Sequence, residues 1–206
     1  MSTTATMATP AAFAEGDALL LVDPQIDFCP GGALGVDEGD RVMPVLSSWA
    51  AAASAAHAPI FVGRDWHPRY TTHFKEQGGV WPPHCVMHTH GAEFHPDLHL
   101  PAEITIVSKG MGEAEDAYSV FQARDEAGTP LRTLLERRGV RHVYIAGLAT
   151  DYCVRSTTLD ALTHGYRVTL IREGMRAVNL QPEDGTRALE EMRAAGADFY
   201  GGAASE

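Results

Sequence analysis

The stretch "HVYIAGLATDYCVRSTTLDALTHGYRVTLI", residues 142–171, decides the fold class. Its two ends, 142–147 and 167–171, are short runs rich in valine, isoleucine and leucine, which is typical of strands buried on both faces. The segment between them predicts a helix over 154–164, and Gly165 follows it where a left-handed cap favours glycine. A strand, a helix and a strand in this order predict a βαβ unit with parallel strands and a right-handed crossover.

The same alternation runs along the rest of the chain. Further apolar runs predict strands at 18–23, 59–64 and 104–109, with a weaker one at 197–200. Helical patterns lie between them, at 38–56, 130–138 and 183–195. We therefore predict an α/β fold, a three-layer α/β/α sandwich with a mostly parallel central sheet of about six strands.

Composition limits the class of protein. The chain has 206 residues, of which 45% are hydrophobic, which suits one domain over residues 18–206. Residues 1–17 lack the basic start and apolar segment of a signal peptide, so we expect a disordered tail. The net charge of −11 argues against nucleic acid and anionic membranes as partners. An odd, sparse set of three cysteines favours a reducing compartment, the cytoplasm.

Reactive side chains follow four of the predicted strands. In an open parallel sheet, sites lie beyond the carboxyl ends of the strands. Asp23 abuts an apolar run, where burial could raise its pKa toward the range of a general base. Cys153 follows a strand at the start of a helix, whose free N–H groups favour a thiolate, so we expect a lowered thiol pKa. Lys109 ends a third strand, and a cation there would hold the thiolate. Buried cysteines are more often simple hydrophobic residues, the interpretation we keep for Cys29 and Cys85.

The long irregular stretch 65–101 predicts a metal site. It holds seven of the ten histidines. Asp65 and His67 point the same way if the segment is extended, and a loop could return His84 to them. Carboxylate and imidazole ligands suit a divalent zinc, iron or manganese ion. His73 and Glu76 remain candidates for a further ligand, and the other histidines are expected around the site or on the surface: His88, His90, His95 and His99.

Five motifs in sequence order carry a family resemblance. The chain resembles the nicotinamidase/pyrazinamidase branch of the isochorismatase-like cysteine hydrolases from about residue 18 to 200, through "VDPQIDF", "GRDWHP", "WPPHC", "SKGMGEAEDAYSVF" and "GLATDYCVRSTTLDAL". The resemblance implies a catalytic triad and a set of metal ligands: Asp23, Lys109 and Cys153 for the triad, and Asp65, His67 and His84 for the metal.

The resemblance also implies the shape of the pocket. A cis peptide is expected at Leu148–Ala149, with the N–H groups of Ala149 and Cys153 forming an oxyanion hole. Phe28 and Trp81 match the aromatic positions that sandwich the substrate ring.

The activity that the resemblance implies is hydrolysis of nicotinamide to nicotinate and ammonia, and of pyrazinamide to pyrazinoate. A cysteine thioester would form, and one divalent metal ion per chain, zinc before iron or manganese, would position the pyridine nitrogen. Such an enzyme would serve NAD salvage. Its partner would be its small-molecule substrate, and the resemblance leaves open whether the chain forms a homo-oligomer.

Three other functions stay open at this point. The first is a metal-free relative that acts on another small amide or on a vinyl ether. The second is an inactive binding module for a pyridine ligand. The third is a hydrolase with zinc-activated water, in which loss of Cys153 would leave substantial activity.

Overall fold

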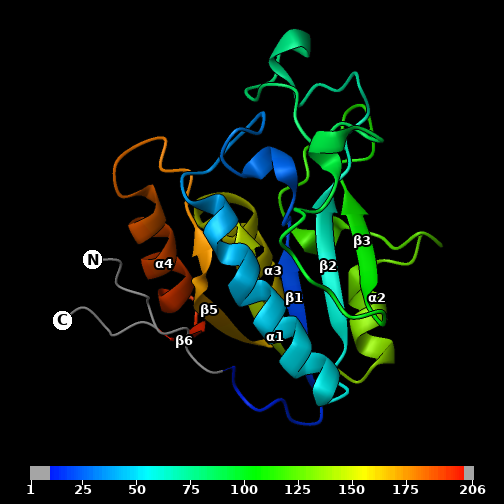
Figure 1. Ribbon diagram of the computed structural model, residues 1–206, viewed down its shortest axis with the longest axis vertical. Helices are drawn as coiled ribbons and strands as arrows, with labels where there is room; N and C mark the ends of the chain where they lie inside the picture. Colours follow the sequence, from blue (N-terminus) through cyan, green and yellow to red (C-terminus); the bar gives the residue numbers. More distant parts are fainter. Residues whose placement is uncertain (1–9, 202–206) are drawn as a thin grey trace.

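The central sheet determines the architecture of the computed structural model, which describes residues 10–201 (Figure 1). Six parallel strands lie in the order β3-β2-β1-β4-β5-β6. They span Asp17–Val22 (β1), Ile60–Asp65 (β2), Thr105–Lys109 (β3), His142–Leu148 (β4), Arg167–Arg176 (β5) and Asp198–Tyr200 (β6). The predicted parallel sheet is confirmed, and β5 is longer than its apolar run indicates.

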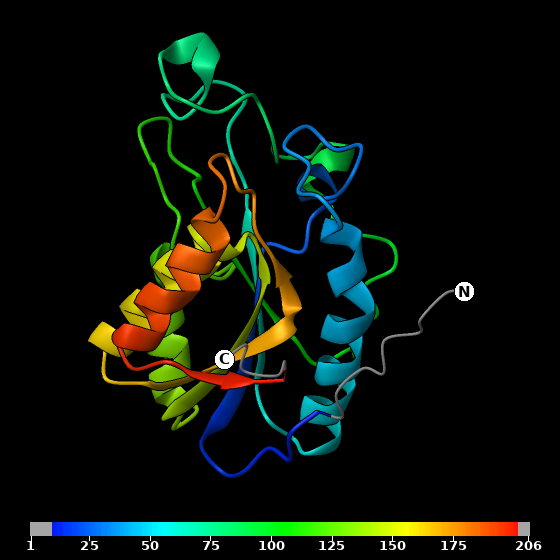
Figure 2. The same ribbon diagram turned by 90° about the vertical axis from the view of Figure 1, so that its left-hand side faces the viewer.

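Helices cover both faces of the sheet. α1 packs on one face, whereas α2, α3 and α4 pack on the other (Figure 2). They span Met43–Ala55 (α1), Leu131–Arg137 (α2), Arg155–Thr163 (α3) and Asp184–Ala194 (α4). This confirms the three-layer sandwich. Within residues 10–201, no helix combines the length and apolarity needed to cross a membrane.

The central strand β1 shows why the strands are apolar on both faces. Leu20 and Val22 belong to the core on the side of α2, α3 and α4, whereas Leu19 and Leu21 belong to the core beneath α1. All four side chains are fully buried. Successive side chains of a strand point to opposite faces, so a strand between two helical layers needs apolar residues at every position.

The N-terminal segment is ordered further than we predicted. Phe13 packs its ring against Tyr144, with centroids 4.9 Å apart, and against Trp49 at 6.0 Å. Asp17 already belongs to β1, and its carboxylate lies 2.9 Å from Nδ1 of His142. The predicted tail is therefore too long at its C-terminal end, because Phe13 finds an aromatic partner in the fold. The rest of that prediction, residues 1–9, lies outside the described residues.

The order of the strands reverses between β1 and β4. From β1 the chain crosses to β2 on one side, and from β4 it crosses to β5 on the other. A ligand site is expected beyond the carboxyl ends at such a switch point. Asp23 follows β1 and Cys153 follows β4, so the two lie at this point. The long connection from β2 to β3 lies over the same edge of the sheet (Figure 1).

Candidate active site

A buried lysine joins the predicted catalytic residues. Nζ of Lys109 lies 2.9 Å from Oδ2 of Asp23 and donates to Sγ of Cys153 at 3.5 Å. Lys109 also donates to Oδ1 of Asp65. The side chains of Lys109 and Asp23 have no exposed surface. Residues from the ends of four strands therefore meet in one buried cluster, as their positions in the sequence predict.

Asp23 is a buried acid beside the lysine. Neither of its carboxylate oxygens has a well-aligned hydrogen-bond partner within residues 10–201, although Lys109 is close. Burial raises the pKa of Asp23 to about 6, although the nearby Lys109 ammonium acts in the opposite direction. Its backbone has φ of 47°, a strained conformation that recurs at functional sites. Asp23 can therefore change its protonation state near neutral pH.

The Cys153 thiol differs from our expectation. Burial raises its pKa well above the ordinary value, Lys109 lowers it and Asp23 raises it further. The predicted lowering by the start of the helix is wrong, because the loss of solvation outweighs the favourable charges. Helical structure also begins earlier than predicted, because a π-helical turn over Thr150–Val154 precedes α3. A raised pKa of this kind favours the protonated thiol.

The peptide before this turn has the expected form. Leu148–Ala149 is a cis peptide bond. The carbonyl of Ala149 accepts hydrogen bonds from the N–H groups of Tyr152 and Val154, at 3.2 and 3.1 Å. Ala149 and Cys153 line one small cavity together.

Aromatic side chains form the walls of that cavity. The predicted Phe28 and Trp81 both line it, together with two residues that were not predicted, Tyr118 and Tyr152. Nε1 of Trp81 donates to the hydroxyl of Tyr118 at 2.9 Å. Tyr152 is adjacent to Cys153 and Tyr118 lies within the fourth motif, so both could have been noted from their positions alone.

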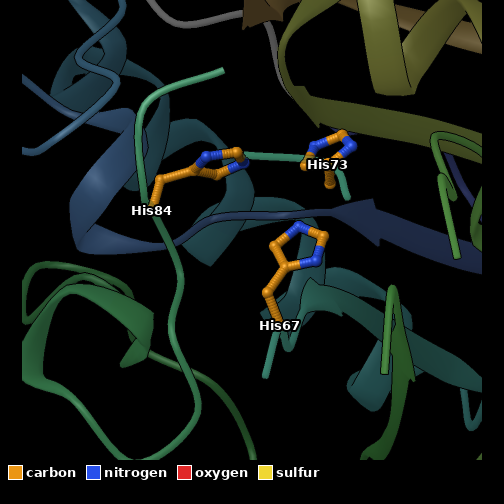
Figure 3. Close-up of side chains that lie close together, drawn as sticks. All are labelled: His67, His73 and His84. Atoms are coloured by element: carbon orange, nitrogen blue, oxygen red, sulfur yellow. The ribbon is translucent and has the colours of Figure 1, made fainter. Parts of the chain in front are cut away.

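Three histidines converge beside the triad. The rings of His67, His73 and His84 face a common point (Figure 3). Their ligand atoms lie within 4.8 Å of one another, and all three side chains are buried. Oδ2 of Asp65 lies 3.7 Å from Nε2 of His67 and 3.8 Å from Nε2 of His84. The three predicted metal ligands are thus brought together with His73, whereas Glu76 is exposed.

The hydrogen bonds of the histidines leave one nitrogen of each ring free for a metal. Nδ1 of His67 donates to the carbonyl of Gly110 at 3.0 Å, and Nδ1 of His84 to that of Pro82 at 2.8 Å. Nε2 of His67 is buried without a hydrogen-bond partner in the described residues. A buried polar atom without a partner is costly, and a metal ion would satisfy it. The donor set therefore fits a divalent ion.

The charge state of Asp65 suits a ligand. Burial alone would raise the pKa of Asp65, but Lys109, His67 and His84 hold it well below the ordinary value. The carboxylate is therefore ionised and can accept a cation.

The remaining candidates lie apart from the site. His88, His90 and His99 are exposed, and His95 is half-buried. Cys29 and Cys85 are buried, and burial raises the pKa of both thiols, that of Cys29 to about 12. Neither thiol lines the cavity that contains Cys153, which agrees with the structural interpretation of both cysteines.

The chain is similar to known proteins over most of its length. The family model described as the isochorismatase domain matches residues 17–203. The nicotinamidase of Escherichia coli (strain K12) is 41% identical over 203 residues, covering 89% of this chain and 93% of its own. The nicotinamidase/pyrazinamidase of Mycobacterium tuberculosis (strain ATCC 25618 / H37Rv) is 39% identical over 185 residues, covering 88% of this chain and 97% of its own. The crystal structure of the pyrazinamidase of Pyrococcus horikoshii in complex with zinc superposes with a TM-score of 0.83 at 45% identity, covering 90% of this chain and 98% of its own.

Proposed function

Because this chain belongs to the isochorismatase domain family and resembles nicotinamidases over most of its length, we propose that it hydrolyses nicotinamide to nicotinate and ammonia. Pyrazinamide, hydrolysed to pyrazinoate, is a second substrate of the same class. The observation that carries this proposal is the contact of Lys109 with Asp23 and Cys153, next to three converging histidines.

The acid and the thiol carry the chemistry. Asp23 takes the proton of the Cys153 thiol, and the sulfur attacks the carboxamide carbon. The N–H groups of Ala149 and Cys153 stabilise the oxyanion. Asp23 then gives its proton to the departing ammonia, and a thioester of Cys153 remains. In the second half, Asp23 takes a proton from water, whose oxygen attacks the thioester carbon. The C–S bond breaks, Asp23 returns the proton to the departing sulfur, and the acid loses its own proton to solvent and leaves as nicotinate.

Lys109 serves both halves of the reaction. Its ammonium group, 3.5 Å from Sγ of Cys153, stabilises the thiolate as the proton leaves. The same group, 2.9 Å from Asp23, favours the ionised carboxylate, which must be present before each attack.

The substrate ring is held by the cavity walls. Phe28 and Trp81 line the cavity that contains Cys153 and offer aromatic faces to a pyridine or pyrazine ring. A divalent ion, zinc before iron or manganese, held by Asp65, His67, His73 and His84, would supply a Lewis-acid contact that orients the ring nitrogen. The metal-free alternative is not favoured, since the buried histidines and the zinc-bound relative both argue against it.

The product of the reaction indicates its metabolic role, and the free thiols indicate the cellular compartment. Nicotinate is a precursor for rebuilding pyridine nucleotides, so the reaction would serve NAD salvage. Three free, buried cysteines favour a reducing compartment, and we place the protein in the cytoplasm on that ground.

The test is an assay of ammonia release from nicotinamide, with and without a chelator. We expect ammonia and nicotinate in equal amounts, with a large loss after chelation that added zinc reverses. Benzamide has the same carboxamide but no ring nitrogen, so it should be a poor substrate. Absence of ammonia release from both nicotinamide and pyrazinamide by zinc-loaded protein would contradict the proposal. Equal efficiency for benzamide and nicotinamide would contradict only the contact with the ring nitrogen.

A further inference from the structure

The loop that follows β3 supplies hydrogen-bond acceptors for two of the three converging histidines. The carbonyl of Gly110 accepts from His67, and a carboxylate oxygen of Asp116 accepts from Nδ1 of His73 at 2.5 Å. The acceptor for His84, the carbonyl of Pro82, belongs to its own loop. Asp116 is therefore the one carboxylate among the three acceptors of these rings.

A carboxylate acceptor fixes how His73 can act. An ionised carboxylate only accepts hydrogen bonds, so Nδ1 of His73 carries the proton and the lone pair of Nε2 is free. Nδ1 is thereby occupied, and Nε2 is the nitrogen left to join His67 and His84 as a ligand. A carboxylate partner also makes an imidazole a stronger ligand and holds the ring in orientation.

The loop that carries Asp116 is also held by hydrogen bonds on either side of that residue. On one side of it, the N–H of Thr72 donates to the carbonyl of Glu113 at 2.8 Å. On the other side, the hydroxyl of Tyr118 accepts from Trp81 at 2.9 Å. The Asp116 side chain itself is 63% exposed, and among residues 10–201 its hydrogen-bond partner is His73. The carboxylate therefore adds little to packing.

We propose that Asp116 is a positioning residue of the metal site, which holds His73 as an Nε2 ligand and so raises the affinity for the divalent ion. The inference rests on the metal contact in the proposed function, and it concerns metal binding itself. It also accounts for a buried histidine hydrogen-bonded to an exposed carboxylate, a pair with little value for stability alone.

The experiment measures zinc affinity by competition with a chromophoric chelator, in the absence of substrate. Asp116→Ala should weaken zinc binding by about 10- to 100-fold, the range found when such partners are removed. Asp116→Asn should lose less, because the amide oxygen still accepts from Nδ1. Glu113→Gln is the matched control, since it removes one exposed carboxylate from the same loop, and it should bind zinc as the wild type does.

Two further measurements separate positioning from a structural role. The metal-free variants should unfold at the wild-type temperature, and the cobalt(II) absorption spectrum of Asp116→Ala should differ from that of the wild type as the orientation of His73 changes. Wild-type zinc affinity in Asp116→Ala would overturn the inference. So would an equal loss in Glu113→Gln, or a lowered unfolding temperature of the metal-free Asp116→Ala protein.

These results are independent of the hydrolysis assay. Nicotinamide turnover with unchanged zinc affinity in Asp116→Ala overturns the inference and leaves the proposed function intact. The expected affinity losses without any nicotinamide turnover overturn the proposed function and leave the inference. A wild-type protein that binds no zinc overturns the inference and the metal contact together.

Discussion

The ammonium group of Lys109 lies 2.9 Å from the carboxylate of Asp23, and neither side chain is exposed. The same ammonium contacts Oδ1 of Asp65, whose Oδ2 faces His67 and His84 at 3.7 and 3.8 Å. Lys109 and Asp65 thus connect the thiol–acid pair to the histidine cluster. A change at either residue is expected to affect both the thiol chemistry and the metal site.

The buried acid predicts a pH limit on activity. Burial raises the pKa of Asp23 to about 6, against the opposing effect of Lys109. Because Asp23 must be ionised to accept the thiol proton, kcat/KM should fall as the pH decreases through about 6. The measurement is kcat/KM for nicotinamide against pH, with bound zinc determined at each point so that loss of metal is recognised. A fall of kcat/KM near pH 4 instead, close to the unperturbed aspartate pKa of about 3.9, would contradict the raised pKa of Asp23.

Cys153→Ala should remove turnover, by roughly 10³-fold or more, because the nucleophile is lost. The variant should keep its zinc content and its circular dichroism spectrum. Cys29→Ala is the matched control, since Cys29 is also buried but lies outside the cavity, and its activity should stay near that of the wild type. Substantial turnover by Cys153→Ala would favour attack by activated water instead.

Asp23→Asn should react with iodoacetamide faster than the wild type and yet be inactive. The negative charge of Asp23 raises the pKa of Cys153, so its removal should lower that pKa. Loss of the proton acceptor should block turnover at the same time. The measurements are the pH dependence of labelling at Cys153 and single-turnover release of ammonia. Normal turnover would show that another group acts as the base.

Lys109→Met should slow labelling of Cys153 near neutral pH, since Lys109 lowers the pKa of that thiol. It should also destabilise the protein by about 3–5 kcal/mol, because two buried carboxylates lose their cation. Labelling is compared at a temperature where circular dichroism shows the variant folded, and denaturant unfolding gives the stability. A labelling curve that overlays the wild type would rule out this role of the lysine.

Gly110→Ala should lose metal affinity. Gly110 has φ of +67°, and a Cβ added there would overlap Cε1 and Nδ1 of the His67 ring. Gly128→Ala is the matched control, because Gly128 has φ of +81° but no atom lies within 4 Å of a Cβ added there. Both variants place a Cβ in a left-handed backbone conformation, which costs roughly 1–2 kcal/mol in each, so the contact with His67 is what distinguishes them. Equal zinc affinity in the two variants would contradict the prediction.

The sequence by itself determined the fold and the meeting of Asp23, Lys109 and Cys153. Apolar runs without alternation predict strands covered on both faces, and parallel strands bring their carboxyl ends to one edge. Asp23, Lys109 and Cys153 each follow or end such a strand, so their meeting follows from the order of the elements alone. The aromatic positions came from the family resemblance. Spacing suggested Asp65, His67 and His84 as metal ligands, but it could not show that they meet, since loop residues have no such geometric rule.

Only the tertiary structure decided between His73 and Glu76. A short helical turn over Lys75–Gln77 follows Phe74, and His73 is buried whereas Glu76 faces solvent, although only two residues lie between them. Asp116, the partner of His73, comes from a different loop, and no local pattern predicts that pairing. The sign of the Cys153 pKa shift likewise could not be predicted from the sequence. It is set by burial and by charges from three strand ends, and those contributions can be compared only when the positions of all the groups are known.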